Sequence, residues 1–147
     1  MGVGVAGVST GVIVLAWLVL LSGYDIRERR LPNALTLPGA GVVVLAAFLT
    51  GRGLAAVAGA AALAGVYLLV HVVAPSAMGA GDVKLALGLG ALTGGVGVEV
   101  WVLAAMGAPL LTAAWGVGAM LRGVRTVPHG PSMCVASALA LALGLGF

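Results

Sequence analysis

The chain has 147 residues, of which 62% are hydrophobic and 7% are charged, and its mean hydropathy is +1.23. A soluble domain of this length would carry about 35 charged residues, whereas this chain has seven cations and four acids. So few charges exclude both a water-facing globular surface and a disordered chain, and a single cysteine excludes a disulfide scaffold. A polytopic membrane protein remains. With a net charge of only +3 and no long basic run, we expect no nucleic-acid partner.

The apolar residues form six blocks in chain order, at 3–24, 35–50, 54–74, 83–98, 100–121 and 131–147. A membrane-spanning helix needs about 20 mostly apolar residues, so six such helices take up nearly the whole chain. Blocks 35–50 and 83–98 are short for a span, and neighbouring helices must cover any backbone that proline or glycine exposes there. The sequence therefore predicts one all-α domain, residues 1–147, with about six transmembrane helices in the lipid bilayer.

Two glycine pairs lie one helical turn apart, Gly7 with Gly11 and Gly90 with Gly94. Small residues at this spacing let helices approach closely in lipid. We expect both pairs to serve tight packing within the chain. A dedicated dimer contact is the alternative, and the oligomeric state stays open.

The cations are divided unevenly between the two sets of alternating loops. One set, at 25–34, 75–83 and 122–131 together with the residues beside it, carries six of them; the other carries only Arg52. Loops rich in lysine and arginine stay in the cytoplasm. We therefore expect a multi-pass protein of the cell membrane whose three cation-bearing loops face the cytoplasm.

The two aspartates of the chain, Asp25 and Asp82, both fall in this cytoplasmic set, at helix ends. An unpaired acid at the membrane edge is costly and is rarely without function. Two carboxylates brought together can share a proton, so that one activates a water while the other polarises a scissile carbonyl. Gly79 and Gly81 precede Asp82. Since glycine lacks a Cβ, we expect a sharp backbone bend there and close approach of a substrate strand.

The cytoplasmic loops contain a set of short motifs. Tyr24-Asp25 is followed by Arg30-Leu31-Pro32-Asn33, then by Gly79-Ala80-Gly81-Asp82 with Val83-Lys84-Leu85, and then by Pro128-His129-Gly130-Pro131. The segment 79–82 matches the GxGD motif of membrane-embedded aspartyl proteases. Taken together and in this order, the segments resemble the type IV prepilin peptidases.

The resemblance implies an aspartic-type endopeptidase without metal or cofactor, in which Asp25 and Asp82 are catalytic. Its substrate would be a type IV pilin-like precursor, whose short basic leader is removed at the cytoplasmic membrane face. The other motif residues would lie near that substrate: Gly79, Gly81, Lys84, Pro32, Asn33, Pro128, Gly130 and Pro131. Larger family members carry a cytoplasmic insertion with paired CxxC motifs, associated with N-methylation. Here about ten residues and one distant cysteine cannot supply four thiolate ligands, so the chain resembles the short, peptidase-only form.

Each aspartate also has a purely structural interpretation. Asp25 can pair with Arg29 at i+4 on a continuing helix, and Asp82 can be the N-cap of the fourth helix. If the first helix ends near Tyr24, its carbonyl end disfavours charge on Asp25, while the N-terminus of the fourth helix favours charge on Asp82. On that basis we expect Asp25 to be protonated and Asp82 ionised. The alternative is a first helix that continues toward Pro32, in which Asp25 feels little of the helix dipole and the charge of Arg29 lowers its pKa.

The remaining polar residues have structural interpretations that we favour. Lys84 is expected to anchor the chain at the lipid headgroups, His71 to be a hydrogen-bonded core residue, and Cys134 to be a small core residue. His129 is given a direct role only as the minor alternative.

Two other functions stay open for the whole chain. A presenilin-like intramembrane protease shares the Tyr-Asp and GxGD motifs, but the Arg-Leu-Pro-Asn and Pro-His-Gly-Pro segments favour the interpretation as a prepilin peptidase. A small polytopic transporter or assembly protein is the other alternative, because paired acids also occur along cation paths. Against it, both acids lie at loop level and the sequence has no inverted repeat.

Overall fold

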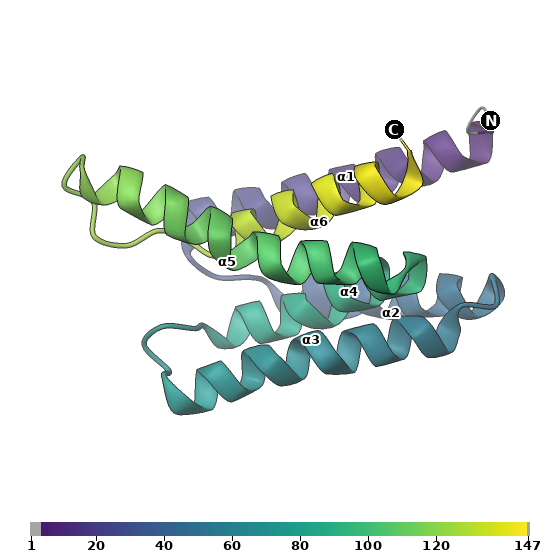
Figure 1. Ribbon diagram of the computed structural model, residues 1–147, viewed down its shortest axis with the longest axis horizontal. Coiled ribbons are helices and arrows are strands. Elements are labelled where there is room, and N and C mark those ends of the chain that lie inside the picture. The colour runs from purple at the N-terminus through teal and green to yellow at the C-terminus, as the bar shows by residue number, and fades with distance from the viewer. Residues whose placement is uncertain (1–3, 147) are drawn as a thin grey trace.

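The computed structural model describes residues 4–146 and contains six α-helices and, within that range, no strand (Figure 1). The helices are α1 (Val5–Glu28), α2 (Asn33–Leu49), α3 (Gly53–Val73), α4 (Ala80–Val96), α5 (Val98–Met120) and α6 (Gly130–Leu145). The all-α membrane class predicted from the apolar blocks is confirmed. Residues 1–3 and 147, at the outer ends of the first and last predicted blocks, lie outside the described residues.

Three of the helices, α1, α3 and α5, are long and apolar enough to cross a membrane. The other three are shorter, with 17, 17 and 16 residues in α2, α4 and α6. A helix of 17 residues is about 25 Å long, at the lower limit for a span. That α2, α4 and α6 also cross the membrane, giving six spans in all, therefore stays a prediction.

Two helix boundaries near the motifs differ from those predicted. Helix α1 does not end near Tyr24 but continues to Glu28, and it ends where Arg29 takes a left-handed conformation with φ 52°. Good helix formers extend the helix past Tyr24, and Pro32, four residues after Glu28, disfavours a helical conformation just before it. Helix α4 begins at Ala80, three residues before the predicted block, because the Asp82 carboxylate accepts the Gly79 N–H and closes its first turn.

The helices alternate in direction along the bundle. In Figure 1 the α1–α2, α3–α4 and α5–α6 connections lie toward one end, while the α2–α3 and α4–α5 turns lie toward the other, with the marked chain ends. At that second end, Arg52 donates to the carbonyl oxygens of Gly95 and Val96, at 3.2 and 2.7 Å, and so caps α4. The three motif-bearing loops therefore share one end of the molecule, as the alternation of the blocks predicts. We call it the loop end.

The close packing of α3 on α4 depends on glycines at their crossing. A Cβ on Gly59 would overlap the Gly90 carbonyl oxygen and lie 2.9 Å from the Gly94 Cα. The Trp101 indole N–H donates to the Gly59 carbonyl at 3.0 Å and ties α5 to the same point. The Gly90–Gly94 step thus serves packing within the chain, as expected. Gly11, of the other predicted pair, has nothing within 4 Å of its ideal Cβ.

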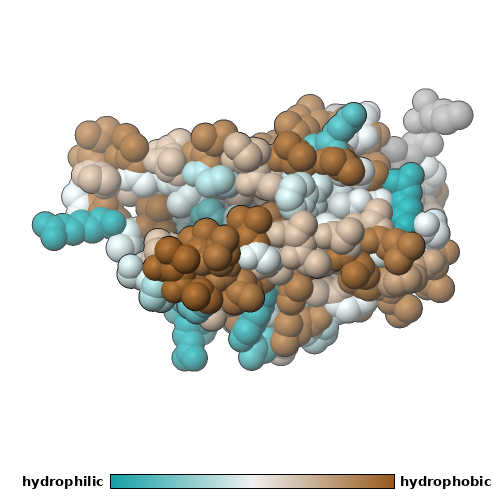
Figure 2. Space-filling model, turned by 60° about the horizontal axis from the view of Figure 1, so that its bottom comes forward, coloured by the Kyte–Doolittle hydropathy of each residue, from teal (hydrophilic) through white to brown (hydrophobic). Residues whose placement is uncertain are grey.

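The outer surface of the bundle is largely apolar. Figure 2 shows hydrophobic side chains over most of one face, with hydrophilic side chains protruding at a few places. Many large apolar side chains of α1, α3 and α5 are exposed, for example Ile13, Leu69 and Leu110. A soluble monomer rarely exposes so much contiguous apolar surface. The exposed faces of these helices are therefore suited to lipid tails.

We expect Gly59→Ala to destabilise the bundle, because its Cβ would meet backbone atoms of α4 that cannot move without separating the helices. The loss should be about 1–3 kcal/mol in the free energy of unfolding, visible as a lower Tm in detergent. Gly65→Ala on the same helix is the matched control, since nothing lies within 4 Å of its Cβ. Equal Tm values for the two variants would contradict this packing.

Candidate active site

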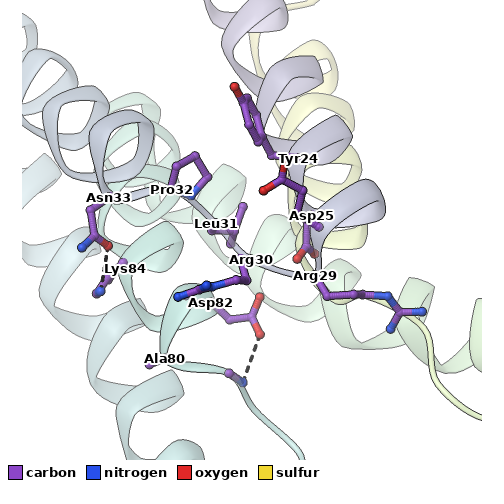
Figure 3. A pocket seen from close by; sticks show the side chains of 13 residues that line it. Tyr24, Asp25, Arg29, Arg30, Leu31, Pro32, Asn33, Ala80, Asp82 and Lys84 are labelled. Carbon is purple, nitrogen blue, oxygen red and sulfur yellow. Dashed lines mark hydrogen bonds between the residues drawn. The ribbon is translucent and has the colours of Figure 1, made fainter.

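Two cavities adjoin at the loop end of the bundle. The first has a volume of about 560 Å³ and lies between the end of α1, the start of α2 and the start of α4 (Figure 3). The second, of about 440 Å³, lies between the α3–α4 and α5–α6 loops. Both are lined by Asp25, Arg29, Gly79 and Asp82. The two aspartates therefore lie at the junction of the cavities, where a bound molecule can reach both carboxylates.

Asp25 is the more deeply placed of the two acids. It is 7% exposed, and its Oδ2 accepts the backbone N–H of Gly130 at 3.0 Å. Gly130 is the first residue of α6, so the Asp25 carboxylate faces the positive end of that helix. A Cβ on Gly130 would lie 2.5 Å from the same oxygen. Only glycine at this position leaves space for the carboxylate to reach the N–H.

The environment of Asp25 corrects two of the expectations. Since α1 continues to Glu28, the carbonyl end at Tyr24 that disfavoured charge on Asp25 does not exist. The Arg29 guanidinium does not hydrogen-bond to Asp25; it donates to the Thr126 carbonyl at 3.1 Å. Arg29 thus ties the α5–α6 loop to the end of α1. The protonated Asp25 was expected from a helix end near Tyr24, and that helix end lies four residues further on.

Asp82 lies in the first turn of α4, at the edge of the loop that precedes it. Its Oδ2 accepts the Gly79 N–H at 3.2 Å. The N-cap of α4 is therefore Gly79, and the expectation that Asp82 occupies the N-cap position is wrong by three residues. The capping interaction comes from within the helix, which leaves the carboxylate beside the cavities.

The glycines of the GxGD segment provide space and do not make the sharp bend that we expected. Gly79 has φ −74° and ψ 150°, which any residue can adopt. A Cβ on Gly79 would lie 3.3 Å from the Asp82 Oδ2, and a Cβ on Gly81 would lie 3.3 Å from the Leu31 Cβ. The first glycine leaves room for the carboxylate, and the second lets the α1–α2 connection pack against α4.

The two carboxylates influence each other. Burial, and after it the negative charge of Asp25, raises the pKa of Asp82 to about 6, while the hydrogen bond from the Gly79 N–H opposes the rise. Figure 3 shows the two side chains reaching from α1 and α4 toward the same space. A carboxyl group with this pKa gains and loses its proton near neutral pH, as a general acid or base must.

Among residues 4–146, no three side chains of His, Cys, Asp or Glu lie close enough together to hold a metal ion.

The family comparison agrees with this geometry. Residues 12–120 match the type IV leader peptidase family, a stretch that includes both aspartates and well over half of the chain. The chain belongs to this family. Neither the curated proteins nor the solved structures gave a match to it. Family membership indicates a peptidase, and the apolar helices place this leader peptidase homologue in a membrane.

The other motif residues of the peptidase fall into two groups. Lys84 donates to the Asn33 side-chain oxygen at 2.8 Å and so joins α4 to the start of α2, and both residues line the first cavity with Pro32. Pro128 lines the second cavity. Gly130 and Pro131 are buried at the start of α6 and do not line either cavity, and Gly130 reaches the site through its N–H, which Asp25 accepts.

His71 is hydrogen-bonded, as expected, since its Nδ1 lies 2.6 Å from the Met78 carbonyl oxygen. This contact holds the loop before Gly79 against α3. The sequence did not single out Tyr67 or Thr112, which both contact the His129 ring. Their partners are 62 and 17 residues away in the chain, so no local pattern marks them.

We expect Gly130→Ala to reduce peptidase activity at least about tenfold, because its methyl group would displace the Asp25 carboxylate from the backbone N–H. Gly23→Ala, on α1 near Asp25, is the matched control, because its Cβ meets nothing within 4 Å. Cleavage of a precursor peptide by the purified variants in detergent measures both. Full activity in Gly130→Ala would show that the N–H of Gly130 is not needed.

Proposed function

We propose that this protein is an aspartic endopeptidase that removes the short basic leader from type IV pilin-like precursors at the cytoplasmic membrane face. One observation carries the proposal: Asp25 and Asp82, 57 positions apart by their numbers, line the same two cavities at the loop end. Membership of the leader peptidase family supports a protein substrate with a leader.

The two carboxyl groups divide the chemistry of hydrolysis between them. The ionised carboxylate takes a proton from a water, whose oxygen attacks the carbonyl carbon of the scissile peptide bond. The protonated carboxyl group donates to the carbonyl oxygen, on which negative charge develops. The carbon–nitrogen bond of the tetrahedral intermediate then breaks, and the leaving amine takes up a proton. No cofactor enters this scheme.

The position of the site suits a substrate anchored in the membrane. The apolar surfaces of α1, α3 and α5 support a position in which the length of the bundle lies in lipid and the loop end lies at the membrane surface. There, the extended segment next to a substrate's own membrane helix can cross from one cavity to the other, over the aspartates. Glu28 lines the first cavity beside Asp25 and adds a third acid on the side that would face a basic leader.

The positive charges support the proposed orientation of the protein in the membrane. Arg27, Arg29 and Arg30 follow one another closely at the end of α1, and Arg122 and Arg125 lie in the α5–α6 loop, all at the loop end. Cationic loops remain in the cytoplasm. The cavities therefore open to the cytoplasmic side.

We expect Asp25→Asn and Asp82→Asn each to lower the rate of leader cleavage by about 10³-fold or more, since neither side chain can then complete the acid–base pair. The double variant should be hardly worse than either single variant, because the two groups act as a unit. Glu99→Gln, an exposed acid at the far end of the bundle, is the matched control and should retain activity. Chelators should have no effect.

The measurement is cleavage of a synthetic precursor by purified protein in detergent, with membrane accumulation of each variant checked by blotting. Full processing by either single variant would overturn the aspartate pair. Cleavage of a precursor with a neutral leader as fast as one with a basic leader would overturn the substrate assignment alone.

Orientation is tested by labelling single cysteines in a Cys134→Ser background. In intact cells, a membrane-impermeant thiol reagent should label Glu99→Cys but neither Arg27→Cys nor Arg122→Cys, because only the first lies away from the loop end. Permeabilised cells, in which all three should react, provide the control. Labelling of Arg27→Cys or Arg122→Cys in intact cells would reverse the proposed orientation.

A further inference from the structure

The His129 residue lines the second cavity together with both aspartates, and its side chain joins three helices there. Its Nε2 lies 2.9 Å from the Tyr67 hydroxyl on α3, and its Nδ1 lies 2.5 Å from the Thr112 Oγ1 on α5. The residue itself directly precedes α6. Tyr67 is buried, and the two aromatic rings lie 5.5 Å apart, so the imidazole is fixed by packing as well as by hydrogen bonds.

The hydroxyl protons decide which nitrogen of His129 carries its proton. The Thr112 hydroxyl donates its single proton to the Ala108 carbonyl at 3.0 Å, so its oxygen accepts from the His129 Nδ1–H. Nε2 is then the acceptor, and the Tyr67 O–H donates to it. The three side chains thus form a directed chain, from Tyr67 through a neutral His129 to Thr112 and the α5 backbone. Burial lowers the pKa of His129, in agreement with a neutral ring.

This chain controls a peptide group that contacts Asp25. The peptide bond after His129 carries the Gly130 N–H that the Asp25 carboxylate accepts at 3.0 Å. The His129 carbonyl accepts the Met133 N–H at 3.1 Å. With the side chain held at both nitrogens and the carbonyl held by α6, the plane of this peptide group has little freedom to rotate.

We propose that Tyr67, Thr112 and His129 are positioning residues that hold the Gly130 N–H against Asp25 and so set the Asp25 carboxylate for its part in the aspartate pair. The inference rests on the proposed function of that pair. It assigns to Tyr67, Thr112 and His129 an effect on the catalytic step that is exerted through the backbone, and His129 does this from the wall of the second cavity.

Thr112 offers the sharpest test because a matched set of variants is available. Thr112→Val removes the hydroxyl and keeps the shape, while Thr112→Ser keeps the hydroxyl and loses the methyl group. Thr50→Val is the distant control, since the Thr50 hydroxyl also donates to the carbonyl four residues earlier, at 3.1 Å, but Thr50 caps α2 at the end of the bundle opposite to the loop end. Tyr67→Phe removes the donor at the other side of the ring.

The Gly130 amide can be observed directly. His129–Gly130 is the one histidine–glycine pair in the sequence, so ¹³C-carbonyl histidine with ¹⁵N-glycine labelling gives a single cross-peak in detergent-solubilised protein. Asp25→Asn should move this signal whatever the activity of the protein, because it changes the acceptor. The NMR reading is therefore independent of the proposed function.

We expect Thr112→Val and Tyr67→Phe to move the Gly130 amide proton upfield and to lower kcat about threefold to tenfold with KM unchanged. Thr112→Ser and Thr50→Val should leave the signal and kcat as in the unaltered protein. An unmoved Gly130 signal in both Thr112→Val and Tyr67→Phe would overturn the positioning role, as would an equal loss in Thr112→Ser. Full activity of Asp25→Asn would instead overturn the aspartate pair itself.

Discussion

Two carboxylates that share a cavity repel each other, and burial at the end of an apolar bundle adds a further cost of several kcal/mol. The structure offsets both through backbone donors. Asp25 accepts the Gly130 N–H, and Asp82 accepts the Gly79 N–H. Both donors lie at helix N-termini, where free N–H groups and the helix dipole favour an anion. The starts of α4 and α6 therefore have to be held in fixed positions beside the end of α1, and the remaining helices serve that arrangement.

Helix packing provides this rigidity with small residues. Gly59, Gly90 and Gly94 bring α3 and α4 into backbone contact, and Trp101 ties α5 to the same place. On the other side of α4, a Cβ on Gly88 would lie 2.8 Å from the Trp17 ring of α1, and the Trp17 indole N–H donates to the Leu35 carbonyl of α2 at 3.0 Å. In lipid, such close contacts and hydrogen bonds replace the hydrophobic effect as the force that holds helices together.

The sequence predicted the fold correctly where a single property, the hydropathy of successive blocks, determined the structure. Hydropathy blocks located the helices, and their alternation placed Asp25 and Asp82 at one end of the bundle. The predicted helix boundaries were wrong where local interactions compete. The end of α1 depends on the left-handed conformation of Arg29, and the start of α4 depends on the hydrogen bond from the Gly79 N–H to the Asp82 carboxylate. The contacts of His129 with Tyr67 and Thr112 depend on the packing of three helices, which no spacing in the sequence encodes.

The contact between Asp25 and Gly130 joins residues 105 positions apart, on the first and the sixth helix. Membrane proteins are inserted from the N-terminus as they are synthesised, so α1 enters the bilayer well before α6 has been translated. Until then Asp25 lacks its backbone donor, and the second cavity lacks the wall that the α5–α6 loop provides. A site that is completed only by the sixth helix stays incomplete during most of the biogenesis of the protein, when unfolded chains are close by.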